Sequence, residues 1–270
     1  SPDRGFLLAK PLGLVLPGLF VWTLSYLHIL PFQPVVIWIT VIIGAILVHI
    51  FPQNRLFWRE AGAKPSVVLY WAAEETLWGS SLLLWTFARG LSPALDSLEK
   101  FMDYGFMMSL WRTSFLPAKD MWQAGSPINY YYFGQYIMTY WAKAAGIHPE
   151  KAYNLSMASL FALTLCLTFG VALLIGHQIR KAYMNTHPAF PLTFASVSAI
   201  LLTVGGNSHV LYYGGTPIGN WLHGLFTRWG LPVGELNLER YWFADATRFI
   251  GYNPDTADKT IHEFPYYSFL

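Results

Sequence analysis

The sequence predicts an all-α fold, a polytopic bundle of transmembrane helices, from its composition and from the length of its apolar runs. Of the 270 residues, 54% are hydrophobic and only 12% are charged, about half the charged fraction of soluble domains. Apolar runs recur from Phe6 to Gly206, and basic residues gather at their ends. We therefore expect one membrane domain over residues 1–270. The chain opens on Ser-Pro-Asp-Arg and closes within an apolar phrase, so we expect it to be part of a longer protein.

Five segments contain the roughly 20 mostly apolar residues that are needed to cross a membrane. They are residues 6–27, 34–51, 66–88, 152–176 and 189–206. Tyr130–Ile147 is a weaker sixth candidate. If it crossed, the basic pair Arg180 and Lys181 would lie on the opposite side from the basic residues at 55–64, which conflicts with the excess of Lys and Arg in cytoplasmic loops. Five spans are therefore expected.

The segment that follows Tyr130 is expected to form a helix that lies along the membrane surface. Tyr131, Gln135, Thr139 and Lys143 recur at every fourth residue and make a polar stripe on an otherwise apolar helix, as in helices that lie in the interface. An ordinary span with its tyrosines in an aromatic belt is the alternative. With a surface helix, residues 89–151 form a large external loop with interfacial helices, and residues 207–270 form an external tail on the same side.

Acidic residues mark the start of this loop. A helix is expected over Leu91–Trp111, entered through a Ser-Pro pair, and it places Glu99 and Asp103 on one face. Like charges at this spacing weaken a helix by a few tenths of a kcal/mol, which a metal, a basic neighbour or a shared proton would offset. In the alternative interpretation, Asp96 and Glu99 cap the helix and Asp103 is simply solvated.

Two further groups of polar residues are candidates for function. Asp120 lies near Trp122 in a Pro- and Gly-rich loop, where a carboxylate and an aromatic ring suit a hydroxyl-rich ligand; a plain turn is the alternative. Glu74 and Glu75 lie near the middle of the third span, where a charge costs about 2.5–3.5 kcal/mol, so they are expected to face the bundle interior or a wet cavity. A functional site and a structural contact between helices both remain open for these two residues.

Other classes of function are disfavoured. The net charge of +2 gives no reason to expect nucleic acid as a partner. The histidines include no pair four residues apart, and the single cysteine, Cys166, lies within an apolar run, so no metal site is expected. The phrase GGTPIG lacks the lysine of a nucleotide-binding loop.

Five phrases of the sequence carry a resemblance to a known family. They are DRGFLLAKPLG, EKFMD, AGSPINYYYFG, AYNLS and TIHEFPYYSFL, and together they extend over nearly the whole chain. On these phrases the chain resembles the YYY family of polytopic membrane proteins, a domain of unknown function that is named for its tyrosine run. That family is similar in layout to the GT-C glycosyltransferases, integral membrane enzymes that move a sugar from a polyprenyl-phosphate carrier to an acceptor on the outer face.

The resemblance implies a GT-C-like fold and a set of site residues. Asp103 is the implied acidic residue that activates the acceptor, with Glu99 as its neighbour and Asp120 as a second choice. Lys119 and Arg248 are the implied contacts of the donor phosphates, since a cation is needed where charge builds on the leaving group. The other implied substrate-binding residues are Trp122, Asn129, Tyr130, Tyr131, Tyr132 and Glu263.

The sequence, with this resemblance, predicts a membrane glycosyltransferase of GT-C type in a prokaryotic plasma membrane, with its catalytic side outside the cytoplasm. The expected partners are membrane lipid and a polyprenyl-phosphate-linked sugar donor. The cofactor is undetermined, with a divalent cation as one option. The alternatives are a transporter or flippase for a lipid-linked or polar solute, which would use Glu74 or Glu75, and a noncatalytic scaffold of the cell envelope.

Overall fold

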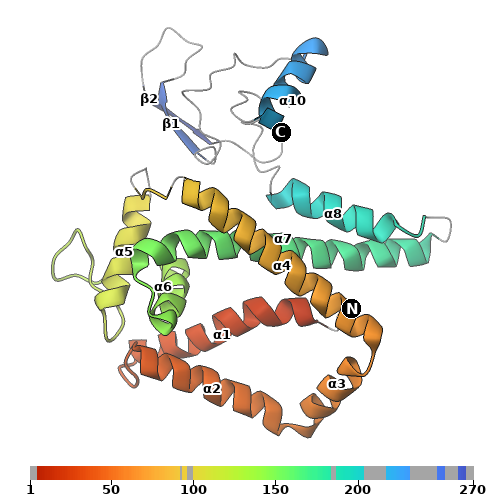
Figure 1. Ribbon diagram of the computed structural model, residues 1–270. Coiled ribbons are helices and arrows are strands. Elements are labelled where there is room, and N and C mark those ends of the chain that lie inside the picture. Colours follow the sequence, from red (N-terminus) through yellow and green to blue (C-terminus); the bar gives the residue numbers. More distant parts are fainter. Residues whose placement is uncertain are drawn as a thin grey trace. The chain divides into compact units, whose positions relative to one another are not determined.

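The computed structural model describes residues 5–91, 93–95, 100–183, 187–203, 217–231, 248–252 and 261–265, most of which are helical. The chain divides into two compact units, Ser1–Leu174 and Ile175–Leu270. The first unit holds α1 to α6 and most of α7, and the second holds the end of α7, α8, α10 and a small sheet (Figure 1).

The five predicted spans coincide with five of the helices. These are α1 (Phe6–Tyr26), α2 (Pro34–Ile50), α4 (Pro65–Leu91), α7 (Pro149–Ala182) and α8 (Phe190–Thr203). Within the described residues, α1 and α7 are long and apolar enough to cross a membrane, and α2 can do so together with α3 (Pro52–Gly62) as one span bent by 82°. The architecture is that of a helical integral membrane protein. The count of five spans and the side on which each loop lies stay predictions.

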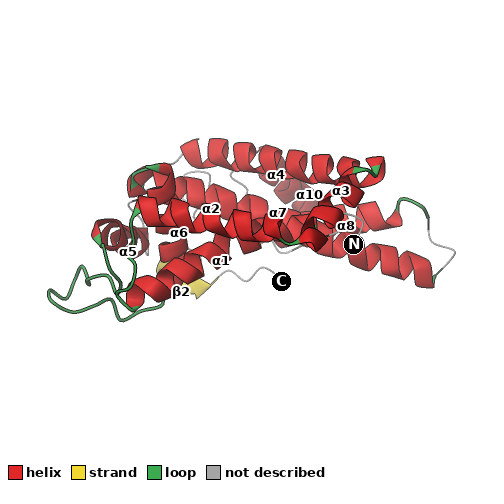
Figure 2. Cartoon of the chain, turned by 90° about the horizontal axis from the view of Figure 1, so that it is seen from below, coloured by secondary structure: helices red, strands yellow, loops and turns green. Residues whose placement is uncertain are grey.

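Two short helices lie crosswise at one end of the first unit. α5 (Lys100–Arg112) and α6 (Phe133–Ala145) have 13 residues each, a length of about 20 Å that is too short to cross the hydrocarbon. Figure 1 shows both standing crosswise to α1 and α2, with α6 at the ends of those helices and α5 beside α6, and α5 is found at that same end in the view of Figure 2. That these two helices lie at the membrane surface stays a prediction.

The start of α5 differs from the prediction. The sequence predicts a helix from Leu91 onward, but Pro93–Leu95 are not helical and α5 begins at Lys100. The carbonyl of Pro93 instead accepts a hydrogen bond from the side-chain amide of Asn154 in α7, at 2.9 Å. The segment after α4 is therefore tied to a neighbouring helix, a long-range contact that no local capping pattern reveals.

α6 docks onto α1 close to a proline. Pro17 lies inside α1, which membrane helices tolerate because neighbouring groups satisfy the backbone that a proline frees. The Tyr136 hydroxyl donates to the carbonyl of Gly18 at 2.8 Å, and the Trp141 indole donates to the carbonyl of Leu14 at 3.0 Å. These two bonds hold α6 across α1.

The core of the first unit is aromatic and lies between α6 and the α1–α2 connection. Its largest fully buried side chains include Tyr136, Tyr140, Phe32 and Phe106. The Trp22 ring of α1 meets the Tyr136 ring edge-on, with centroids 4.6 Å apart. Burial raises the pKa of Tyr140 to about 12 and also raises the pKa of Tyr136. Both hydroxyls therefore keep their protons near neutral pH. The Tyr136 hydroxyl serves as a hydrogen-bond donor, and Tyr140 packs within the core.

The polar stripe of α6 points inward, contrary to the expectation that it faces water. Gln135 donates to Asp103 of α5 at 2.7 Å, and Thr139 is fully buried. Lys143 is also buried, and its ammonium donates to the carbonyls of Phe32 and Thr113, each at 2.8 Å. The stripe turns inward because α5 and the α1–α2 connection offer polar partners to it. Lys143 thereby joins three segments of the chain.

Replacing Lys143 by Met should destabilise the protein by about 2–4 kcal/mol, since two carbonyls lose their donor and each unsatisfied group costs about 1–3 kcal/mol. The stability of the parent should also depend on pH, because burial lowers the pKa of Lys143 from 10.5 to about 8. Between these two values the unfolded chain binds more protons, so stability rises with pH, by up to about 1.4 kcal/mol per pH unit.

Unfolding in detergent across pH 7 to 10 measures both effects. The matched control is Lys151→Met, because Lys151 is exposed at the same end of the bundle. The cost of Lys143→Met should grow between pH 8 and 10, whereas the control should show a small cost without such growth. Equal pH profiles for the parent and Lys143→Met would contradict this account of the buried lysine.

The second unit contains an element that the all-α prediction missed. Strands β1 (Arg248–Tyr252) and β2 (Ile261–Pro265) pair antiparallel, with Arg248 opposite Pro265 and Ile250 opposite Glu263. Phe, Ile and Tyr favour strands, but the run RFIGY is too short to show the alternation of apolar and polar residues that predicts a strand. The unit also holds α10 (Pro217–Arg228) and a close α7–α8 contact, where a Cβ on Gly176 would lie 2.8 Å from the backbone of Pro191.

Candidate functional site

The carboxylate of Asp103 lies between α5 and α6. Asp103 stands in the first turn of α5, where the positive end of the helix dipole stabilises a negative charge. Gln135 of α6 donates its amide hydrogen to Oδ1 of Asp103 at 2.7 Å, and the aspartate is half-buried. A neutral amide on one helix therefore orients an acidic group on another. Sequence reasoning selected Asp103 but did not identify Gln135 as its partner.

Exposed aromatic rings contact α5 one helical turn after Asp103. Trp122, Tyr130 and Tyr131 form what we call the aromatic platform, and all three are exposed. Tyr130 and Tyr131 stack with their ring centroids 4.0 Å apart. Trp122 and Tyr130 both contact Phe106, at 6.1 and 5.8 Å between centroids, and Phe106 is three residues after Asp103 on α5. The fold thus places an oriented carboxylate and a surface of aromatic rings at the same end of α5.

Asp120 shapes the loop that carries Trp122. Its Oδ1 accepts hydrogen bonds from the backbone N–H groups of Trp122 and Gln123, at 2.7 and 2.9 Å, which is the turn that aspartate commonly forms. Its own N–H donates to the carbonyl of Ser126 at 2.8 Å. The plain-turn alternative therefore describes what Asp120 does in the structure, and it positions one ring of the aromatic platform.

The tyrosine run divides between surface and core. Tyr131 is 75% exposed, whereas Tyr132 is 6% exposed and contacts Trp22 with ring centroids 5.2 Å apart. Burial, and to a smaller extent the neighbouring Tyr26, raises the pKa of Tyr132 to about 12. Tyr132 therefore packs the core, and the two preceding tyrosines are the ones that a ligand at the surface can reach.

The remaining predicted residues are spread over the chain. Lys119 and Asn129 are exposed on neighbouring segments, which are joined by a backbone bridge between Lys119 and Pro127. Arg248 and Glu263 belong to the paired strands of the second unit. Glu99 lies outside the described residues.

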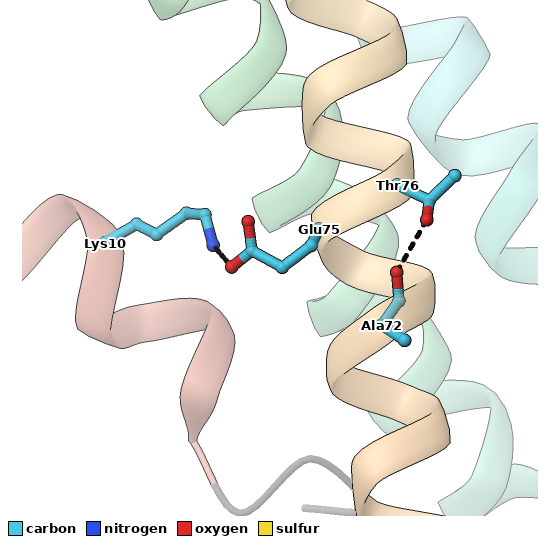
Figure 3. Close-up of polar contacts among 4 residues, drawn as sticks. All are labelled: Lys10, Ala72, Glu75 and Thr76. Atoms are coloured by element: carbon cyan, nitrogen blue, oxygen red, sulfur yellow. Dashed lines mark hydrogen bonds and ion pairs between the residues drawn. The ribbon is translucent and has the colours of Figure 1, made fainter.

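The two acids of α4 take different positions. Glu75 forms an ion pair with Lys10 of α1 (Figure 3), and the Lys10 ammonium also lies over the Phe6 ring, 4.8 Å from its centroid. Glu74, the preceding residue, is buried. The structural alternative, a contact between helices, is therefore what the structure shows for Glu75. The sequence placed Lys10 only at the end of an apolar run and gave no sign of its partner 65 residues away.

Sequence reasoning also missed a second polar contact, at the end of the first unit that holds α5 and α6. Arg89, near the end of α4, donates from Nη2 and Nε to the side-chain oxygen of Asn154, at 2.6 and 3.2 Å. Within the residues that the structure describes, no group of three or more His, Cys, Asp or Glu side chains is placed to hold a metal ion.

Comparison with known proteins identifies a family for this chain but no activity. A family model described as "Uncharacterized membrane protein (DUF2298)" matches residues 16–270. No curated protein matches the chain, and no solved structure matches it.

Proposed function

The chain belongs to this family of uncharacterized membrane proteins, and we propose that it is a membrane glycosyltransferase of GT-C type. It would transfer a sugar from a polyprenyl-phosphate-linked donor to an acceptor on the extracytoplasmic face of a prokaryotic plasma membrane. The observation that carries the proposal is the carboxylate of Asp103, which Gln135 orients one helical turn before Phe106, the residue that the aromatic platform contacts. GT-C likeness of the fold is part of the same proposal.

The position of this carboxylate suits a donor with a lipid tail. α6 lies at the ends of α1 and α2, with α5 beside it (Figure 1). A polyprenyl chain within the hydrocarbon would present its phosphate and sugar at the level of these crosswise helices. Exposed tyrosine and tryptophan rings suit the sugar of such a donor and the water around it. Each has an apolar face that can pack against a sugar ring and a polar tip that can bond to water.

In the proposed reaction an acceptor hydroxyl attacks the anomeric carbon of the donor sugar. Asp103 accepts the hydroxyl proton as the new glycosidic C–O bond forms, and a positioned carboxylate typically contributes about 10²–10⁴-fold to such a step. The bond from the anomeric carbon to the phosphate oxygen breaks, and its electron pair leaves with the polyprenyl phosphate. Lys119 is the proposed cation for that phosphate, and Asn129 is a proposed contact of the sugar. Arg248, Glu263 and Glu99 stay predictions from the sequence.

Transfer by the full-length protein in proteoliposomes tests this function directly. A panel of polyprenyl phosphates with labelled hexoses serves as donors, and envelope polysaccharide and protein from the parent cells serve as acceptors. We expect label to move from the lipid-soluble donor into the acceptor fraction. A complete absence of transfer for every donor, in vesicles where a known lipid-dependent transferase is active, would contradict the proposal.

A second candidate function rests on a different observation, the ion pair between Lys10 of α1 and Glu75 of α4. Paired charges among membrane helices mark the pathways of many transporters, so a transporter or flippase for a lipid-linked or polar solute is the alternative. Glu75→Gln would then lower solute flux in proteoliposomes and leave sugar transfer unchanged. The reverse pattern, with transfer lost through Asp103 and flux absent, favours the transferase.

A further inference from the structure

α3 connects α2 to α4 at the end of α2 that lies away from α5 and α6. α2 begins at Pro34, beside the segment that Lys143 holds, ends at Ile50 and has 17 residues. That length is about 25 Å. α3 then turns by 82° from the axis of α2. If α2 runs across a membrane, α3 therefore lies close to the membrane plane at the opposite face from α5 and α6 (Figure 1).

The turn into α3 is held by side chains. Asn54 donates its amide hydrogen to the carbonyl of Val48 at 2.8 Å, and Arg55 donates from Nε to the carbonyl of His49 at 2.6 Å. The last carbonyls of a helix lack partners within the helix itself, so both residues satisfy groups at the end of α2. The guanidinium of Arg55 is thereby fixed in direction at the start of α3.

α3 has an apolar face and a cationic face. Ala61 is buried, and Trp58 meets the Trp71 ring of α4 with centroids 5.6 Å apart. Phe57 and Trp58 are nevertheless 38% and 39% exposed, so apolar surface remains beside α4. On the other face the exposed Arg55 and Arg59 lie one helical turn apart. Like charges at that spacing repel each other, and an anion between them would remove the repulsion.

We propose that α3 lies in the headgroup layer of the membrane face opposite α5 and α6, and that Arg55, Arg59 and Lys64 bind the phosphate groups of anionic phospholipids there. Three exposed cations stand against one exposed acid, Glu60, in this segment. Cations together with exposed Trp and Phe are the composition of helices that lie on anionic membranes. A soluble phosphate would meet the cations but would leave the aromatic rings in water, so a lipid is the occupant that satisfies both faces.

Lipid titration of the full-length protein tests this proposal independently of any transferase activity. The protein in phosphatidylcholine–detergent micelles is titrated with phosphatidylglycerol, and the midpoint of thermal unfolding gives an apparent affinity. Each cation near an anionic surface strengthens binding by about fivefold. The double variant Arg59→Gln/Lys64→Gln should therefore weaken the apparent affinity by about 25-fold. Arg55 is left in place because its bond to His49 holds the turn.

The matched control is Arg112→Gln/Lys151→Gln, which removes the same charge from exposed positions at the α5 and α6 end. It should keep the affinity of the parent, and Arg59→Lys should keep most of it because the charge is retained. The interaction should also weaken as salt rises. An unchanged affinity in Arg59→Gln/Lys64→Gln, or equal losses in the two double variants, would overturn the proposal. Binding of inorganic phosphate with no response to phosphatidylglycerol would overturn it as well.

Discussion

Replacing Asp103 by Asn in the full-length protein should lower sugar transfer by about 100-fold or more, which is the usual contribution of a positioned general base. The fold should be retained, because the new side-chain oxygen can still accept the hydrogen bond that Gln135 donates to Asp103 at 2.7 Å. Initial rates of transfer from polyprenyl-phosphate donors, with the thermal midpoint measured on the same samples, separate lost chemistry from lost folding.

Asp120→Asn is the control that the structure offers for this experiment. Asp120 uses Oδ1 to accept two backbone N–H bonds, and the oxygen of an asparagine amide accepts the same bonds. Transfer should therefore stay close to the parent rate. Full activity in Asp103→Asn together with a large loss in Asp120→Asn would move the acid–base role to Asp120. Unchanged turnover in both variants would favour the noncatalytic scaffold.

Replacing Lys10 by Met should cost about 3 kcal/mol of folding stability if α4 crosses the membrane as the sequence predicts, because Glu75 would lose its ion-pair partner. A single charged residue at the centre of a membrane helix costs about 2.5–3.5 kcal/mol, whereas in water the half-exposed Glu75 would cost at most about 1 kcal/mol. The fraction of folded protein against the mole fraction of sodium dodecyl sulfate measures the effect. Lys181→Met, at an exposed position near the end of α7, is the control and should change little.

The double variant Lys10→Met/Glu75→Leu distinguishes a pair from two independent residues. With both charges removed, no unpaired charge stays in the apolar surroundings, so the double variant should be more stable than Lys10→Met alone. Costs that simply add would show that the two side chains do not stabilise each other. Flux measurements on Glu75→Gln then decide whether the pair also serves transport.

Helix positions in the first unit could be predicted from the sequence because membrane helices are recognisable by their length and apolarity. The predicted span at 34–51 and the observed α2 (Pro34–Ile50) differ by a single residue at one end. The boundary of α5 could not be predicted, since the bond from Asn154 to Pro93 joins residues that are 61 positions apart. The β1–β2 pair was missed for a related reason, because two five-residue strands become recognisable only when they meet.

The candidate site also contains residues that the sequence reveals and contacts that it does not. Asp103 and the tyrosine run stand out in the sequence because acids and aromatic rings are conspicuous between apolar segments. Their surroundings are not local: Gln135 reaches Asp103 from 32 residues away, and burial separates Tyr132 from Tyr130 and Tyr131. No spacing rule anticipates which of three successive tyrosines faces the core.

The amino-acid sequence is enough to identify a helical integral membrane protein and to locate most of its helices, because transfer of apolar side chains out of water depends on composition along a continuous stretch. Three features become visible only in the folded chain: the polar stripe of α6 turns inward, Lys10 meets Glu75, and Lys143 joins three segments. Those outcomes depend on which distant donors and acceptors can satisfy a buried polar group, and partners of that kind come together only when the chain has folded.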